Sequence, residues 1–523
     1  MSISDILTLI GLLFAIFAFI YEGEGEFIFI KFNWFDVVLI ALAFLLLNYL
    51  VYYEFYFEKG WVWKALYFSW GLNPSTWAYI VSLGIIGYLF FRIFFGVIPF
   101  SNREKLINFY KRLINKGDFD KVMGYIEKYH EKNIYQYHAV FAKNQHLEDA
   151  EYEKAGEHRR WQLMRGDVEY KNNAPYSRQE KLAGSVYRSI IERDDFIKAT
   201  ANEFPYFYSE IIKHFTYKYS PNEAVIDSFF TTLLENNNPF LKRELKSNVN
   251  LEEGERNNYR LEEDNLILKS VLLDLRVAEH TFVWRPFGEV AIQETTSFPE
   301  EHFLFQLYES NIHTDSKFLD LAMGKSIHFF DLMVCQVIYK KYPYHMWLPY
   351  YYHFTKAILQ NAPFKEDYAI EDWNRDYPVN FLYLIYRMTA NIYDWYHAME
   401  DALSSGQRIT ISKTMSGILL EIANSESIGE LWKINQFNLF IKIYCEVSTS
   451  PRKEGHVQES EEVVASIAQS IEDVMINPAY GRDEEKNEYH RILKLAWGQS
   501  FDRVPYEETT VLDVLREKVF DLI

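Results

Sequence analysis

The chain has 523 residues, too many for one hydrophobic core, and 49% of them are hydrophobic. Its formal net charge is −19, and nearly all of that excess falls after residue 100, which argues against general nucleic-acid binding. Glycine and proline are scarce, with 22 and 15 residues, so few positions interrupt helices. We therefore expect an all-α protein.

Three apolar runs near the N-terminus predict membrane-spanning helices: Ile6–Tyr21, Val37–Tyr53 and Trp77–Phe100. The third would be about 36 Å long as a helix, enough to cross a bilayer core of about 30 Å. Four cations follow it: Arg103, Lys105, Lys111 and Arg112. By the positive-inside rule, we expect the rest of the chain in the cytoplasm and the N-terminus outside. The protein would then be a multi-pass protein of the inner (cell) membrane.

The segment Gly60–Thr76 between the second and third runs has two interpretations. It is either an aromatic-rich segment at the outer interface or a re-entrant segment whose irregular backbone lines a water-filled path. The second interpretation gives the layout of a tetrameric pore-loop channel, although the potassium-filter sequence TVGYG is absent. The candidate pore and gating residues are Gly71, Asn73, Gly84, Gly87 and Arg92. The plain alternatives are helix packing for the glycines and snorkelling for Arg92.

The remainder of the chain predicts a large helical body in several lobes. We expect a membrane domain over residues 1–100, a juxtamembrane lobe over 101–250, a core lobe over 251–446, a linker over 447–460 and a C-terminal lobe over 461–523. The first thirty or so residues of the body resemble one hairpin of a tetratricopeptide-like stack, but no repeat at that period follows. Apolar runs at 268–277, 318–339 and 378–399 are expected to form central helices.

The most cation-dense stretch of the body supplies the candidate ligand site. Two arginines beside a tryptophan can hold a phosphate and stack a base. The alternative is a solvated helix face, because acidic residues lie nearby in the sequence. The residues concerned are Arg159, Arg160, Trp161 and Arg165.

Neither a catalytic site nor a metal or cofactor site is expected. Cys335 and Cys445 lie within apolar helical patterns and are expected to be buried thiols. Among the histidines of the core lobe, His397 has acidic residues at helical ligand spacing, namely Glu400 and Asp401. HExxH, phosphate-loop, dinucleotide-binding and GxSxG motifs are absent.

A few N-terminal spans, the WKALYFSWGLNPS segment and a large helical body resemble the layout of channel-forming effectors of bacterial antiphage systems, including the Hailong type. The resemblance implies a homo-oligomeric ion channel, gated by a nucleotide or oligonucleotide signal that a partner synthase makes. Two alternatives stay open. One is a membrane-tethered scaffold for protein partners, and the other is an enzyme whose site is dispersed along the chain.

Overall fold

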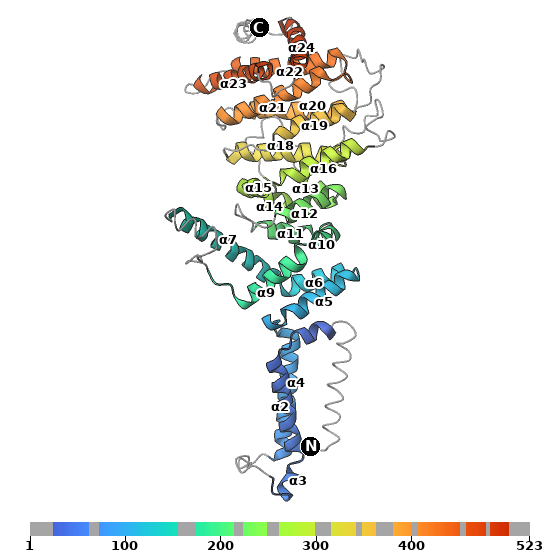
Figure 1. Ribbon diagram of the computed structural model, residues 1–523, viewed down its shortest axis with the longest axis vertical. Helices are drawn as coiled ribbons and strands as arrows, with labels where there is room; N and C mark the ends of the chain where they lie inside the picture. Colours follow the sequence, from blue (N-terminus) through green and yellow to red (C-terminus); the bar gives the residue numbers. More distant parts are fainter. Residues whose placement is uncertain are drawn as a thin grey trace. The chain divides into compact units, whose positions relative to one another are not determined.

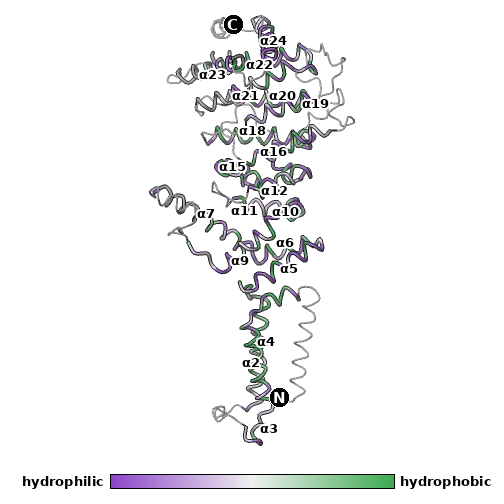
Figure 2. Tube along the Cα trace, viewed as in Figure 1, coloured by the Kyte–Doolittle hydropathy of each residue, from purple (hydrophilic) through white to green (hydrophobic). Residues whose placement is uncertain are grey.

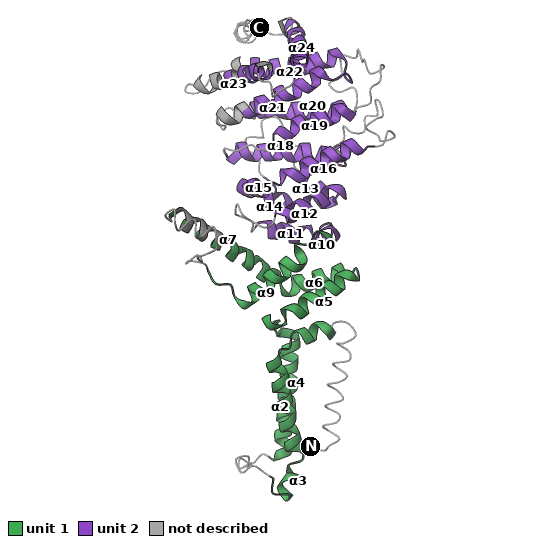
Figure 3. Cartoon of the chain, in the orientation of Figure 1, with its two compact units in different colours: residues 1–196 green, residues 197–523 purple. Residues whose placement is uncertain are grey.

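The computed structural model describes residues 25–61, 73–154, 174–213, 223–247, 261–298, 315–340, 342, 348–361, 380–398, 405–449, 457–476 and 482–501. Every regular element within these ranges is a helix, which confirms the all-α prediction (Figure 1). The chain divides into two compact units, residues 1–196 and 197–523 (Figure 3). The predicted first span, Ile6–Tyr21, and the lobe boundary expected near residue 250 lie outside the described residues.

The first unit contains two long apolar helices followed by a set of more polar ones. A short helical stretch at residues 25–30 precedes them. The elements are α2 (Trp34–Val51), α3 (Tyr53–Glu58), α4 (Pro74–Phe95), η2 (Phe100–Asn102), α5 (Arg103–Asn115), α6 (Phe119–Tyr129), α7 (Glu131–Lys154), α9 (Arg178–Val186) and η3 (Tyr187–Ile191), with α10 (Asp194–Thr200) at the boundary between units.

Helices α2 and α4 pack against each other and are hydrophobic along most of their length (Figure 2). Leu47 of α2 meets Ile85 and Leu89 of α4 in a small buried cluster. The buried residues of α4 recur at three- and four-residue spacing, so one stripe faces α2 and the rest of its circumference is open. Both helices are long and apolar enough to cross a membrane by length and composition.

The third apolar run ends as a helix earlier than the sequence predicts. We expected helix to Phe100, whereas α4 ends at Phe95 and its C-cap, Gly96, has an extended backbone with ψ 134°. The physical reason is Pro99, which has no N–H to donate and whose ring would clash with the carbonyl four residues earlier. The chain resumes as the single 3₁₀ turn η2, so α4 and α5 are separate helices with an extended connection between them.

Helices α5 and α6 form the hairpin that the sequence predicts directly after the apolar run. Gly117, between them, has φ +80°, a backbone conformation that glycine adopts without a steric penalty. Leu106 and Phe109 of α5 are buried, as are Val122 and Ile126 of α6. The hairpin therefore has an apolar interior, and α7, α9 and η3 pack against it.

The second unit is built of stacked helices, as Figure 1 shows. Its elements are α11 (Pro205–Lys213), α12 (Glu223–Glu235), α13 (Pro239–Lys246), α14 (Leu266–Leu272), α15 (Leu275–Thr281), α16 (Trp284–Ser297), α17 (Asp315–Phe318), α18 (Ala322–Lys340), α19 (Pro349–Asn361), α20 (Asn380–Ala398), α21 (Ser405–Asn424), α22 (Glu430–Thr449), α23 (Val457–Ile476) and α24 (Asp483–Phe501). Helix occupies both ends of the expected linker at 447–460, since α22 reaches Thr449 and α23 begins at Val457.

Packing in the second unit runs along two series of helices. In one, α12, α16, α19 and α21 each pack on the next, and in the other α18, α20 and α22 do so. The central helices expected from the sequence are present, and α18 is buried on all sides from Ala322 to Ile338. Cys335 and Cys445 are buried free thiols, as predicted. Each layer buries its apolar face on its neighbours, which is how stacked helical units gain stability.

Candidate functional site

The N-terminal end of α2 carries a buried carboxylate. Asn33 Oδ1 accepts a hydrogen bond from Asp36 N at 2.8 Å, and Asp36 Oδ2 accepts one from Asn33 N at 2.7 Å. This reciprocal capping box satisfies backbone N–H groups that the first turn of a helix leaves open. Asp36 is only 4% exposed, so its charge must be met by partners within the protein.

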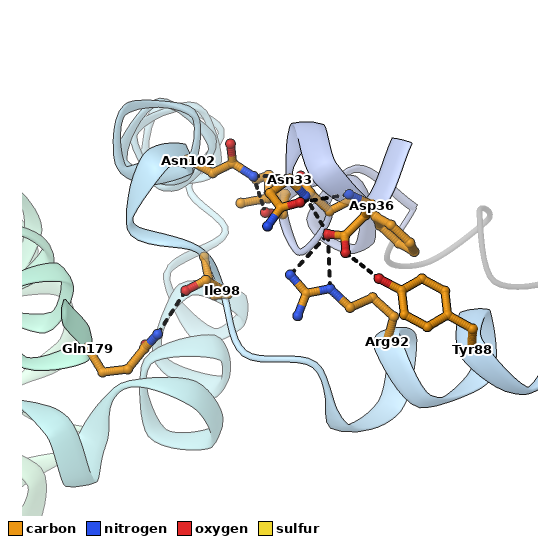
Figure 4. Close-up of polar contacts among 9 residues, drawn as sticks. Asn33, Asp36, Tyr88, Arg92, Ile98, Asn102 and Gln179 are labelled. Carbon is orange, nitrogen blue, oxygen red and sulfur yellow. Dashed lines mark hydrogen bonds and ion pairs between the residues drawn. The ribbon is translucent and has the colours of Figure 1, made fainter. Parts of the chain in front are cut away.

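Those partners come from the last turns of α4. Arg92 Nε and Nη2 each lie 3.2 Å from Asp36 Oδ2, and the Tyr88 hydroxyl donates to Asp36 Oδ1 (Figure 4). Tyr88 and Arg92 are four residues apart and therefore project from the same face of α4. In surroundings as apolar as these, an ion pair is screened little, so it holds the start of α2 against the end of α4.

Lys31, which follows the helical stretch 25–30, caps the same C-terminal end of α4. Its Nζ donates to the carbonyl oxygen of Ile93 at 2.7 Å and lies 4.5 Å from the centre of the Tyr129 ring. The carbonyl of Ile93 is among the last four of the helix, which have no partner within the helix itself. A cation there also interacts favourably with the helix dipole. Lys31, 2% exposed, thus ties α4 to α6.

The extended connection after α4 is fixed by two side-chain amides. Asn102 Nδ2 donates to the carbonyls of Ile30 at 2.8 Å and Phe32 at 2.7 Å, and Gln179 Nε2 from α9 donates to the carbonyl of Ile98 at 3.1 Å (Figure 4). A Cβ on Gly96 would lie 2.1 Å from the carbonyl oxygen of Arg92, so only glycine fits there.

We call the set of Lys31, Asp36, Tyr88, Arg92, Gly96, Asn102 and Gln179 the joint. Asp36, Tyr88 and Arg92 join α2 to α4. The side chains of Lys31, Asn102 and Gln179 bond backbone carbonyls at the end of α4, before α2 and in the connection after α4, respectively. Through Lys31 and Gln179, the end of α4 and the connection after it are linked to α6 and α9.

Of the sequence-predicted pore residues, Arg92 belongs to the joint. Asn73 is the N-cap of α4, where its Oδ1 accepts a hydrogen bond from Thr76 N at 2.9 Å. Gly84 and Gly87 lie on the open face of α4, because a Cβ on either would meet nothing within 4 Å. Gly71 lies outside the described residues, as do all of residues 62–72 in the segment between Gly60 and Thr76.

The sequence-predicted ligand residues, Arg159, Arg160, Trp161 and Arg165, lie in 155–173, outside the described residues. Asp36, Tyr88, Lys31 and Asn102 were not singled out from the sequence. Asp36 and Lys31 did carry a signal, because they are charges at the edge of an apolar run, where an unpaired charge is costly. Their partners are more than fifty positions away and are not visible in local spacing.

Buried titratable groups in the polar helices have structural partners. Burial lowers the pKa of His130, the C-cap of α6, to about 4, and its Nε2 lies 3.0 Å from the Tyr110 hydroxyl. In α18, burial lowers the pKa of Lys325 to about 8, and its Nζ donates to the carbonyl of Asp320 at 3.3 Å.

Within the described residues, no group of three or more His, Cys, Asp or Glu side chains could hold a metal ion. His397 is described, whereas Glu400 and Asp401 are not.

Comparison with known protein families, with characterised proteins and with solved structures finds no match for this chain.

Proposed function

We propose that this chain is a ligand-gated membrane effector, in which α2 and α4 cross a bilayer and a signal bound by the helical body opens or closes an oligomeric pore. One observation carries the membrane part. Within the described residues, the exposed large hydrophobic side chains fall between Phe29 and Val97, with four exceptions: Leu273, Phe282, Tyr339 and Leu495. Such a continuous apolar surface is unfavourable in water and suits lipid.

The joint supports gating. Gating requires two arrangements of the membrane helices and a ligand that prefers one of them. Lys31 and Gln179 tie the end of α4 and the connection after it to α6 and α9, so a rearrangement in those helices changes the position of α4. The cations after α4 favour a cytoplasmic body.

The open face of α4 supports oligomerisation. Gly84 and Gly87 leave room for a close approach by another helix, and two helices alone cannot enclose a water-filled path. Several copies, with a tetramer as the favoured number, would line a pore with this face of α4. A nucleotide or oligonucleotide signal from a partner synthase remains the proposal that the resemblance to antiphage effectors suggests.

A membrane-tethered scaffold is the second candidate. The stacked helices of the second unit favour it, because proteins built of stacked helical layers commonly present extended surfaces to protein partners. In that case α2 and α4 serve only as anchors, and the joint attaches them to the polar helices of the first unit.

Ion flux across liposomes that contain the full-length protein separates the two candidates. The channel proposal predicts protein-dependent flux that changes in Gly84→Leu and Gly87→Leu, where a bulky side chain enters the open face of α4. Gly124→Leu is the matched control, because Gly124 of α6 also has open space around its Cβ position but lies outside the apolar pair. Silent liposomes with inserted, folded protein would contradict the channel and leave the scaffold.

A further inference from the structure

A hollow of about 730 Å³ lies within the first unit, between α5 on one side and α9 with η3 on the other. This volume is in the range of small-molecule sites. Phe100 and Arg103 line it at the start of α5, and Lys181 and Arg188 line it from the α9 side. We call this hollow the cationic pocket. The described residues that line it are not those of the predicted Arg159–Arg165 site.

The cationic pocket concentrates positive charge in a strongly acidic chain. Four cations line it, and Glu104 is the one carboxylate among its lining residues. Within the described part of the chain, none of the four cations forms an ion pair. Cations gathered in one place repel one another and attract an anion. The four are Arg103, Lys111, Lys181 and Arg188.

Part of the pocket wall is held in place before any ligand binds. Tyr137 of α7 is buried, and its hydroxyl accepts hydrogen bonds from Arg188 Nε at 3.2 Å and Nη2 at 2.5 Å. The Tyr137 ring lies directly on α9, because a Cβ on Gly184 would come within 2.4 Å of it. Arg188 itself stands on η3, a π-helical turn, and such turns are frequent at functional sites.

We propose that the cationic pocket binds the phosphate group of a phosphorylated organic ligand. Guanidinium and ammonium groups are the side chains that hold phosphate, and the hydroxyl of Ser189 adds a donor. Phe100 and Tyr176 provide aromatic surface for the organic part of the ligand. The phosphate is carried either by an anionic phospholipid headgroup or by a soluble metabolite. The chemistry of recognition is shared, and the experiment distinguishes the two sources.

The position of the pocket links its occupancy to the membrane helices, a step that rests on the proposed function. Phe100, which lines the pocket, is the first residue after the Gly96–Pro99 connection. The opposite wall, α9, holds that connection through Gln179 and the carbonyl of Ile98. A phosphate that draws Lys181 and Arg188 towards Arg103 and Lys111 moves α9 relative to α5, and with it the exit of α4.

The test uses the full-length protein in phosphatidylcholine nanodiscs, titrated calorimetrically with phenyl phosphate and with inorganic phosphate. We expect saturable binding that Lys181→Gln weakens by roughly tenfold or more, as the loss of one charge-assisted hydrogen bond implies. Lys105→Gln is the matched control, because Lys105 is an exposed lysine on α5 that does not line the pocket. An equal effect of both substitutions would overturn the pocket.

The lipid source is tested by retention of phosphatidylglycerol over phosphatidylcholine on the purified protein. Retention that falls in Lys181→Gln and is displaced by phenyl phosphate assigns the pocket to a headgroup, and saturable phenyl phosphate binding without such retention assigns it to a soluble ligand. If neither probe distinguishes Lys181→Gln from Lys105→Gln, the proposal fails. Binding without ion flux contradicts only the channel, whereas flux without pocket-dependent binding contradicts only the pocket.

Discussion

Asp36 and Arg92 lie 56 positions apart in the chain and on different helices, yet they form an ion pair with 3.2 Å between Oδ2 and Nη2. Both side chains are largely shielded from solvent. The pair joins the first turn of α2 to the last turn of α4. The energetic consequence of breaking it is therefore larger than for a surface ion pair.

Arg92→Leu is expected to destabilise the protein by about 3 to 5 kcal/mol, because Asp36 is then left buried without its counter-charge. The double variant Asp36→Leu with Arg92→Leu should recover much of that loss, since neither charge remains to be compensated. Thermal unfolding of the full-length protein in detergent measures both, with the exposed Lys105→Leu as control. If the single and double variants unfold at the same temperature, the pair contributes no coupling.

Lys31→Met keeps a similar unbranched chain as far as Cε and removes the ammonium group that caps α4. We expect a loss of about 1.5 to 3 kcal/mol, the usual magnitude for a hydrogen bond to a charged donor. The carbonyl of Ile93 is left unpaired at a buried position. Lys59→Met, at an exposed position, should leave the unfolding temperature unchanged. A Lys31→Met protein as stable as the parent would show that this lysine does not tie α4 to α6.

Gly96→Ala and Gly87→Ala should have opposite effects. At Gly96 the added Cβ would lie 2.1 Å from the carbonyl oxygen of Arg92, so the connection must shift and stability falls. At Gly87 the Cβ has open space, and alanine is preferred to glycine within a helix by about 0.5 to 1 kcal/mol. Unfolding temperatures of the two variants compare them directly. Equal tolerance at both positions would show that the extended connection is not held as described.

His130 makes stability depend on pH. Its pKa is lowered by burial to about 4, so the unfolded chain binds the proton more readily between about pH 6.5 and 4. Stability is therefore full above about pH 6.5 and falls as the pH drops towards 4, by about 3 kcal/mol. His130→Gln should flatten this part of the profile in unfolding measurements at several pH values. An unchanged slope in that variant would assign the pH dependence to other groups.

Local pattern was enough to predict the helical class, the α5–α6 hairpin and the central helices such as α18, because these depend on apolar periodicity and turn residues. Arg92 was also singled out from the sequence, as a candidate pore or gating residue, since a charge inside an apolar run is visible without a structure. Its partner Asp36 was not, because the pairing joins distant positions. The end of α4 was misplaced although Pro99 marked it, since the apolar run continues to Phe100.

The cationic pocket could not have been predicted for the same reason. Arg103 and Lys111 read as the positive flank of an apolar span, while Lys181 and Arg188 belong to a helix far along the chain. Only the packing of α5 against α9 and η3 brings the two pairs to one hollow. From the sequence we assigned the ligand to residues 159–165, because cations are adjacent there. A sequence shows which residues are neighbours along the chain, but not which are neighbours in space.

Cysteine labelling in sealed proteoliposomes tests most directly the claim that α2 and α4 cross the bilayer. The native Cys335 and Cys445 are buried, so single cysteines introduced elsewhere report on their own positions. Leu45→Cys and Phe91→Cys, on the open faces of the two helices, should resist a membrane-impermeant maleimide, whereas Ser75→Cys and Lys105→Cys should react from opposite sides. Labelling of all four positions from one side would contradict a membrane-crossing pair.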